Sequence, residues 1–428
     1  MLDINFIREN QEVVKQAIKD KEIDLDLSEL LVLDEQRRNL IAKGDELRKR
    51  SNEIADTVPK ASDGKKKQLI DEGKKVKAEV LEIETKKKTV EDDWQRLMYL
   101  VPNIPSPDTP IGGEADFKVI DEWGKVSKFD FTIKDHIELG KALDIIDLER
   151  GVKVAGFRGY FLKNEGVLLH FGVLMLALKK MIAKGFLPMV TPTLVREEVL
   201  YGSGHFPGER REIYEVEEAG DKDKELKFLA GTAEPSLLAY HLGETLKEKD
   251  LPVKLCGISP CYRREVGGYG KDTKGVYRIH EFMKVEQVVL AKNDVGESEK
   301  IFQEMNENAR ELLRELALPH RVIQIASGDM GLGKYKMFDI ETWMPGRQGY
   351  GETHSNSNLT DWQARRLDIK YRDKFNKNQY VHTLNNTVIA SPRILIAILE
   401  NNQQKDGSVL VPEALREFVG KDVIHPKK

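Results

Sequence analysis

The sequence predicts an α+β protein in which an antiparallel pair of long helices precedes a domain built on a largely antiparallel β-sheet. Three observations predict it: seven-residue apolar spacing in residues 28–99, a proline-dense segment at 101–113, and short extended segments after it. A chain of 428 residues exceeds what one hydrophobic core usually organises. We therefore expect an N-terminal domain over residues 1–110 and a second domain over residues 111–428.

The first domain carries two apolar series with a period of seven residues, separated by a break at 57–64 that contains proline and glycine. Val80 and Trp94 supply the second seam position of a coiled coil. A short turn between two long helices predicts that they pair antiparallel and form a projecting arm. The series comprise Leu33, Leu40, Leu47 and Ile54, then Leu69, Val76, Ile83, Val90 and Leu97.

Lysines outnumber acidic residues around the turn of this hairpin. A cationic tip on an arm suits contact with a phosphate backbone, although lysine-rich helix faces also occur on purely structural elements. The net charge of −4 gives no bulk attraction for nucleic acid, so any RNA binding must be local. The lysines are Lys60, Lys65, Lys66, Lys67, Lys74, Lys75 and Lys77.

The second domain interleaves helical and extended segments. Residues 166–183 predict an apolar helix with Gly185 as its C-cap. Short connections favour antiparallel pairing of the extended segments over repeated βαβ units. The predicted strands are 186–192, 254–266, 276–290, 321–327, 337–344 and 382–390.

Residues 261–287 read as a strand, a glycine-rich loop and a second strand. Alternation places Arg263 and Glu265 on one face of the first strand. A charged sheet face is costly unless it lines a site for a charged ligand, and Phe282 on it could stack on a base. A solvent-exposed ladder of ion pairs is the alternative. The predicted face of the second strand comprises Arg278, His280, Phe282, Lys284 and Glu286.

A second charged feature lies near the C-terminus. Ser391 is the predicted N-cap of a helix and Pro392 its first residue, so Arg393 falls in the first turn. A cation is disfavoured there unless an anion such as a polyphosphate binds opposite; an incidental surface arginine is the alternative. Glu352 and Ser355 offer hard oxygen ligands for Mg²⁺ beside phosphates.

Several function classes are disfavoured. No stretch approaches roughly 18–20 uncharged apolar residues, so an integral membrane protein is not expected. The N-terminus lacks the apolar region of a secretory signal, and Cys256 and Cys261 fit neither a disulfide framework nor a CxxC metal pair. No phosphate-binding P-loop occurs. The expected location is the cytoplasm.

Taken together, these motifs resemble the seryl-tRNA synthetases, a family of class II aminoacyl-tRNA synthetases, over essentially the whole chain. The opening MLDINFIREN, the hairpin and the Asn-Ile-Pro linker resemble the tRNA-binding domain of that family. Residues up to 192–195 resemble class II motif 1, 261–287 motif 2 and 383–401 motif 3. Residues 232–234 and 354–366 are specific to the seryl branch.

The resemblance implies roles for matching residues. Arg263 and Arg393 would be catalytic, the first bridging the α-phosphate and the substrate carboxylate, the second holding the γ-phosphate. Glu352 and Ser355 would arrange Mg²⁺. The implied ATP-binding residues are Arg263, Arg264, Glu265, Ile279, His280, Glu281, Phe282, Glu352, Thr353, His354, Ser355 and Arg393. The implied serine-binding residues are Thr232, Ala233, Glu234, Arg263, Glu286, Asn385 and Thr387.

The implied fold is a class II antiparallel sheet flanked by helices, working as a homodimer through the motif 1 region. The implied activity is ATP-dependent formation of seryl-adenylate and transfer of serine to tRNA(Ser), with tRNA(Sec) as a further substrate. The alternatives are an adenylating enzyme with another acceptor and a non-catalytic RNA-binding paralogue. The hairpin argues against the first, and retention of Arg263, Glu286 and Arg393 argues against the second. Departures from the commoner family pattern occur at Arg264, Gly351, His354, Asn356 and Asn386.

Overall fold

The computed structural model describes residues 1–208, 210–217, 226–266 and 274–427. The chain divides into two compact units, one formed by Leu2–Pro102 and the other by Met1 and Asn103–Lys428. The helices of the first unit are α1 (Ile4–Glu9), α2 (Gln11–Asp20), α3 (Leu27–Thr57) and α4 (Asp63–Met98), with a short 3₁₀ turn, η1 (Val58–Lys60), between the last two.

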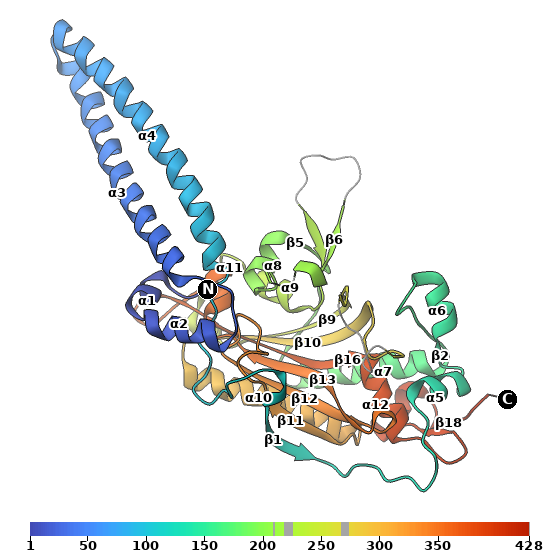
Figure 1. The fold of residues 1–428 in the computed structure, drawn as a ribbon. Helices are drawn as coiled ribbons and strands as arrows, with labels where there is room; N and C mark the ends of the chain where they lie inside the picture. The colour runs from blue at the N-terminus through green and yellow to red at the C-terminus, as the bar shows by residue number, and fades with distance from the viewer. Residues whose placement is uncertain (209, 218–225, 267–273, 428) are drawn as a thin grey trace. The chain divides into compact units, whose positions relative to one another are not determined.

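Helices α3 and α4 lie side by side as a long antiparallel hairpin (Figure 1). Every residue of the two predicted apolar series, together with Val80 and Trp94, is buried or half-buried. The helices approach closely at Gly44, where an added Cβ would lie 3.6 Å from Ile83. Ion pairs such as Arg48 with Glu84, 3.0 Å apart, cross between the helices at the surface. The predicted coiled-coil arm is confirmed.

The second unit is built on a sheet that is eight-stranded within the described residues. Neighbouring strands pair antiparallel except at one edge, where β4 runs parallel to β9. The predicted antiparallel sheet is thus confirmed, with one parallel exception. In spatial order the strands are β1 (Lys118–Trp123), β11 (His320–Gln324), β12 (Lys336–Met344), β13 (Gly349–Asn358), β16 (His382–Ser391), β10 (Glu281–Ala291), β9 (Val253–Tyr262) and β4 (Leu187–Val190).

Helices cover both faces of this sheet. Val289 of β10 belongs to the core shared with α7 (Glu165–Ala183) and α10 (Val295–Glu315). Its neighbour Val288 points the other way, into a second core shared with α9 (Glu234–Ala239) and α11 (Trp362–Leu367). The other elements used below are α5 (His136–Ala142), α6 (Leu148–Ala155), α8 (Glu197–Ser203) and α12 (Arg393–Asn401).

The two charged strands are shorter than predicted. Strand β9 ends at Tyr262 rather than 266, and Glu265 has the left-handed φ of 51°, which takes the chain out of the sheet. Strand β10 begins at Glu281 rather than 276, because the preceding backbone bonds elsewhere: the carbonyl of Tyr277 accepts from Arg393 Nε at 3.0 Å. The predicted alternation of Arg278 and His280 with Phe282 is therefore wrong.

Two predicted helix ends also differ by a residue or two. The C-cap of α7 is Lys184, and Gly185 follows it with a φ of 82°. Ser391 is the last residue of β16, not an N-cap, because it pairs with Met283 in the sheet. The N-cap of α12 is Pro392, so Arg393 does stand in the first turn as predicted.

Helix α7 is long and apolar enough to cross a membrane by length and composition alone, which the sequence reading did not anticipate. One side of it, including Leu169 and Val173, packs into the main core. The other side carries half-exposed Leu168 and Phe171. A helix that packs into a protein core can have the same length and apolar composition as a membrane span. Helix α7 is such a core helix of the second unit.

Candidate active site

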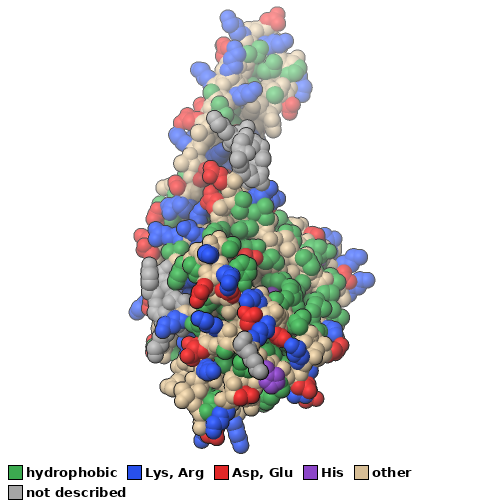
Figure 2. Space-filling view, turned by 90° about the vertical axis from the view of Figure 1, so that its right-hand side faces the viewer, with side chains coloured by type: hydrophobic (Ala, Val, Ile, Leu, Met, Phe, Trp, Pro, Cys, Tyr) green, Lys and Arg blue, Asp and Glu red, His purple; other side chains and the backbone are tan. Residues whose placement is uncertain are grey.

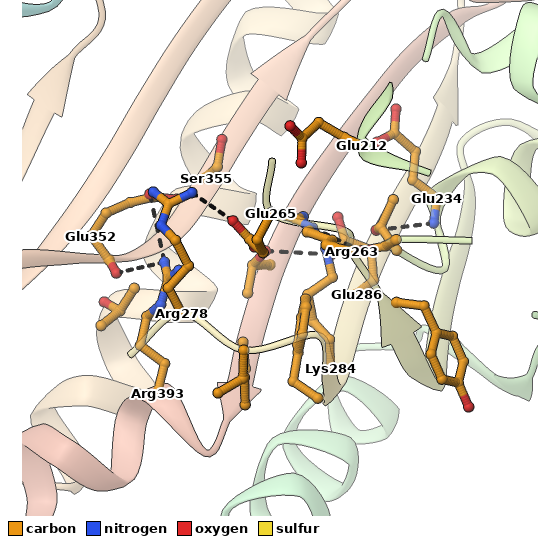
Figure 3. Close-up of a pocket in the computed structure, with 18 of the residues that line it drawn as sticks. Glu212, Glu234, Arg263, Glu265, Arg278, Lys284, Glu286, Glu352, Ser355 and Arg393 are labelled. Carbon is orange, nitrogen blue, oxygen red and sulfur yellow. Dashed lines mark hydrogen bonds and ion pairs between the residues drawn. The ribbon is translucent and has the colours of Figure 1, made fainter. Parts of the chain in front are cut away.

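A cavity of about 500 Å³ opens on the sheet face that carries Phe282, Lys284 and Glu286 (Figure 3). Its walls come from β10, β13, β16, the first turn of α12 and the loops that follow β9 and precede β10. The predicted site residues that line it are Thr232, Glu234, Arg263, Glu265, Ile279, Phe282, Glu286, Glu352, Thr353, Ser355, Asn385, Thr387 and Arg393.

Other predicted site residues lie outside the lining. His354 falls between Thr353 and Ser355 on β13, so alternation turns it to the opposite face, where Nε2 bonds the carbonyl of Val388 at 3.1 Å. Burial lowers the pKa of His354 to about 3. The residues outside the lining are Ala233, Arg264, His280, Glu281 and His354, of which Ala233 and His354 are buried and Arg264 and Glu281 exposed.

One end of the cavity holds a buried acid paired with a lysine. Glu286 Oε2 lies 2.5 Å from Lys284 Nζ and 3.4 Å from the hydroxyl of Thr387, and its carboxylate is almost fully enclosed. Burial raises the pKa of Glu286, against the opposing charge of Lys284. The arrangement leaves an enclosed carboxylate that can accept a hydrogen bond from a small polar ligand.

A second buried carboxylate, Glu234, stands in the same cavity. Its Oε1 accepts from Gln363 Nε2 at 2.7 Å and from Asn385 Nδ2 at 2.9 Å. Burial alone would raise the pKa of Glu234, but the charge of Lys334 and the bond from Gln363 contribute to holding it below its usual range. Glu234 is therefore an anion suited to an ammonium group.

The opposite end of the cavity carries an arginine beside an acid, since Arg393 NH1 lies 3.6 Å from Glu352 Oε2. Arg393 projects from the first turn of α12, and its NH1 donates to the carbonyl of Glu352 at 3.1 Å. Its guanidinium stacks over the ring of Tyr277, 4.5 Å from the centroid. These contacts hold the guanidinium of Arg393 at the N-terminal end of α12, where an anionic ligand could bind to it (Figure 3).

Arg263 lies between the two ends. Its Nε donates to the carbonyl of Gly231 at 3.3 Å, and its guanidinium lies over the ring of Phe282, 5.4 Å from the centroid. Nearby, the carboxylate of Glu265 accepts from Arg278 NH1 at 2.6 Å (Figure 3). An aromatic face and a charged fork thus stand together where a planar base and a phosphate could bind.

The structure adds lining residues that the predicted site did not contain. Arg278 and Lys284 carried a signal, since their charges stood out in the strand pattern. Asp329 and Lys334 lie in the glycine-dense loop before β12, and His205 lies in the turn after α8. None of these three residues belongs to a predicted motif. The added residues include His205, Glu212, Tyr277, Arg278, Lys284, Asp329 and Lys334.

The Arg393 end of the cavity could hold a divalent cation only together with a phosphate-bearing ligand. Among the described residues, no group of three or more His, Cys, Asp or Glu side chains could hold a metal ion by itself. Glu352 and Ser355 nevertheless both face the cavity. Behind them, among the described residues, Asp339 Oδ1 is buried without a hydrogen-bond partner, and burial, followed by the negative charge of Glu352, raises the pKa of Asp339. The two oxygen-bearing side chains in the lining suit Mg²⁺ bound jointly with phosphates.

The antiparallel sheet and its two convergent arginines define the catalytic domain of a class II aminoacyl-tRNA synthetase. Residues 214–402 match the tRNA synthetase class II core domain (G, H, P, S and T). Residues 1–105 match the seryl-tRNA synthetase N-terminal domain.

Individual relatives agree over the full length. The serine–tRNA ligase of Deinococcus radiodurans is 45% identical over 421 residues, with 98% of each chain covered. The seryl-tRNA synthetase of Pyrococcus horikoshii, solved in complex with ATP, superposes with a TM-score of 0.89 at 36% identity, covering 100% of both chains. The cytoplasmic serine–tRNA ligase of Naegleria fowleri, in complex with AMP, gives 0.86 at 30% identity, covering 100% of this chain and 99% of that one. The chain belongs to the seryl-tRNA synthetase family of aminoacyl-tRNA ligases.

Proposed function

We propose that this protein is a serine–tRNA ligase, which activates L-serine with ATP to seryl-adenylate and transfers serine to the 3′ end of tRNA(Ser). The observation that carries the proposal is the convergence of Arg263, Arg393 and Glu286 on one cavity. Two guanidinium groups suit a nucleotide triphosphate, and the enclosed acid suits a small alcohol. Family membership supports the same activity.

In the activation step the carboxylate of serine attacks the α-phosphorus of ATP, and pyrophosphate leaves. The serine carboxylate is already ionised, so the chain needs no general base here; positioning and charge neutralisation dominate. Arg263 bridges the α-phosphate and the attacking carboxylate, and Arg393 holds the γ-phosphate. Phe282 stacks on adenine, and Glu265 accepts from its amino group while Arg278 fixes the carboxylate.

Mg²⁺ bound with ATP would neutralise charge on the phosphates. Glu352 and Ser355 would hold it, because hard oxygen ligands and substrate phosphates together satisfy this ion. Their side chains face the cavity on the same side as Arg393.

Selection of serine rests on the two buried acids. Glu234, with Thr232 beside it, receives the amino group, and Glu286 with Thr387 receives the side-chain hydroxyl. Alanine would leave the Glu286 site without its hydroxyl partner, a penalty that a hydrogen-bonding pocket imposes on an analogue lacking the group. Asn385 keeps Glu234 oriented.

The arm would bind the tRNA. The seven tip lysines, Lys60, Lys65, Lys66, Lys67, Lys74, Lys75 and Lys77, are all exposed, as phosphate contact requires. The substrates would be tRNA(Ser) and, as a further one, tRNA(Sec), and the site of action the cytoplasm.

An apolar surface supports the proposed homodimer. Figure 2 views the side of the second unit that carries α6, and hydrophobic side chains gather on it. Phe171 of α7 is 50% exposed and Val190 of β4, just before the motif 1 proline, 84% exposed. Large exposed apolar patches mark protein interfaces, which supports a second copy of the chain as the partner.

The test is ATP–pyrophosphate exchange with each of the twenty amino acids, followed by charging of tRNA(Ser). Serine alone should support rapid exchange, and serine should then appear on the tRNA. Exchange without charging would indicate an adenylating enzyme with another acceptor. No exchange, with tRNA still bound, would indicate an RNA-binding paralogue.

A further inference from the structure

The turn after α8 carries a histidine into the cavity. Helix α8 ends at Ser203, and Gly204 follows with a left-handed φ of 90°. An added Cβ on Gly204 would lie 2.5 Å from the ring of Trp362, so only glycine lets the turn lie against α11. This turn places half-buried His205 in the cavity wall.

The hydroxyl of Ser203 lies beside one ring nitrogen of His205. Its oxygen lies 2.9 Å from His205 Nδ1 and 3.2 Å from the carbonyl of Leu200, to which it can donate. When the hydroxyl proton goes to Leu200, the oxygen accepts from Nδ1–H. Nε2 is then the acceptor, which is the tautomer that a general base requires.

The same turn is tied to the substrate end of the cavity. Gln363 Nε2 donates both to the backbone carbonyl of Ser203, at 2.8 Å, and to Glu234 Oε1, at 2.7 Å. The Oε1 atom of Gln363 in turn accepts from the hydroxyl of Thr383 at 2.7 Å. One buried amide thus fixes the position of the His205 turn relative to the proposed amino-group site.

We propose that His205 accepts the proton in the second half-reaction, an inference that rests on the proposed function. The terminal ribose hydroxyl of the tRNA attacks the carbonyl carbon of seryl-adenylate, and a carbon–oxygen ester bond forms. The bond between that carbon and the phosphate oxygen breaks, and AMP leaves with the electron pair. The hydroxyl proton passes to His205 Nε2.

The experiment separates the two half-reactions. Enzyme preloaded with serine and ATP is mixed with a limiting amount of tRNA(Ser), and one round of transfer is timed; pyrophosphate exchange is measured separately. His205→Ala should slow transfer about 100-fold and exchange far less. Added imidazole should restore part of the transfer rate in His205→Ala, because it replaces the missing base, but not in His205→Gln, whose side chain fills the space.

The matched control is His241→Ala, since this second histidine bonds Glu244 outside the cavity lining and its loss should change neither half-reaction. Ser203→Ala should slow transfer by a smaller factor, because His205 Nδ1 loses its hydrogen-bond partner. An equal loss of both half-reactions in His205→Ala, or a loss that imidazole does not repair, would overturn the assignment. Absence of serine-dependent exchange in the unaltered protein would instead refute the proposed function itself.

Discussion

The helical arm and the cavity of the second unit both contain ion pairs, but the pairs differ in solvent exposure. In the arm, the side chains of Arg48 and Glu84 are 48% and 47% exposed; in the cavity, those of Lys284 and Glu286 are 7% and 2% exposed. Exposed pairs contribute about 0–1 kcal/mol to stability, whereas removing one partner of a buried pair costs about 3–5 kcal/mol. The arm can therefore change its charges with little effect on folding, and the cavity cannot.

The largest effect is expected from Arg263, the guanidinium proposed to act at the reacting phosphorus. Arg263→Ala should lower serine-dependent pyrophosphate exchange by about 1,000-fold, because charge stabilisation at the reacting phosphorus is lost. Thermal unfolding should stay unchanged, since the side chain is exposed. Arg372→Ala, an exposed arginine outside the cavity lining, is the control. Near-normal exchange in Arg263→Ala would remove this residue from the reaction.

Breaking the buried pair should affect both folding and specificity. Glu286→Gln leaves Lys284 enclosed without its counter-ion, so the free energy of unfolding should fall by about 3 kcal/mol. The KM for serine should rise about 100-fold while that for ATP changes little. Chemical denaturation and exchange kinetics measure the two effects. A variant as stable as the wild type would contradict the view that the pair is buried.

Changes at the arm tip should spare folding and adenylate formation alike. Replacing Lys65, Lys66 and Lys67 with glutamine should raise the KM for tRNA about tenfold at low salt and flatten its salt dependence, because fewer counterions are released. Serine-dependent exchange should be unaffected. The control replaces Lys86, Lys87 and Lys88, which lie farther along α4, with the same loss of charge. Equal effects of the two triple variants would argue against a tip-specific contact.

The smallest effect is expected from an exposed pair in the arm. A hydrogen bond from Lys86 lowers the pKa of Glu82. Glu82 therefore contributes stability above its unfolded-state pKa of about 4.3, and that contribution is lost as the pH falls through its lower folded-state pKa. Glu82→Gln should lower the melting temperature slightly at pH 7 and not at pH 3. A large change in melting temperature at pH 7 would contradict the view that exposed ion pairs of the arm contribute little to stability.

Periodicity predicted what depends on local sequence. The seven-residue spacing from Leu33 to Leu97 located the coiled coil, and strand alternation placed Phe282, Lys284 and Glu286 on one face correctly. The errors arose where backbone groups bond outside the sheet. Residues 276–280 look extended, but Val276 N–H donates to His136 and the carbonyl of Tyr277 accepts from Arg393.

Tertiary placement explains the lining residues that no sequence motif predicted. His205 enters the cavity only because Gly204 turns against Trp362, more than 150 residues away in sequence, and no spacing rule encodes that contact. His354 lies outside the cavity lining for the converse reason. It belongs to a predicted motif, but alternation along β13 directs its side chain to the opposite face of the sheet. The family resemblance supplied positions, whereas the direction of each side chain required the fold.

Helix α7 has one further consequence. His170 on its inner side bonds the hydroxyl of Ser391 at 2.8 Å, and Ser391 precedes Arg393 by two residues. Phe171, next in sequence, is exposed on the outer side. A protein surface that pressed on Phe171 and rotated α7 would pull on Ser391 and so shift the guanidinium of Arg393. A contact on the outer side of α7 would then reach the cavity through the stiffness of a single helix, without a hinge.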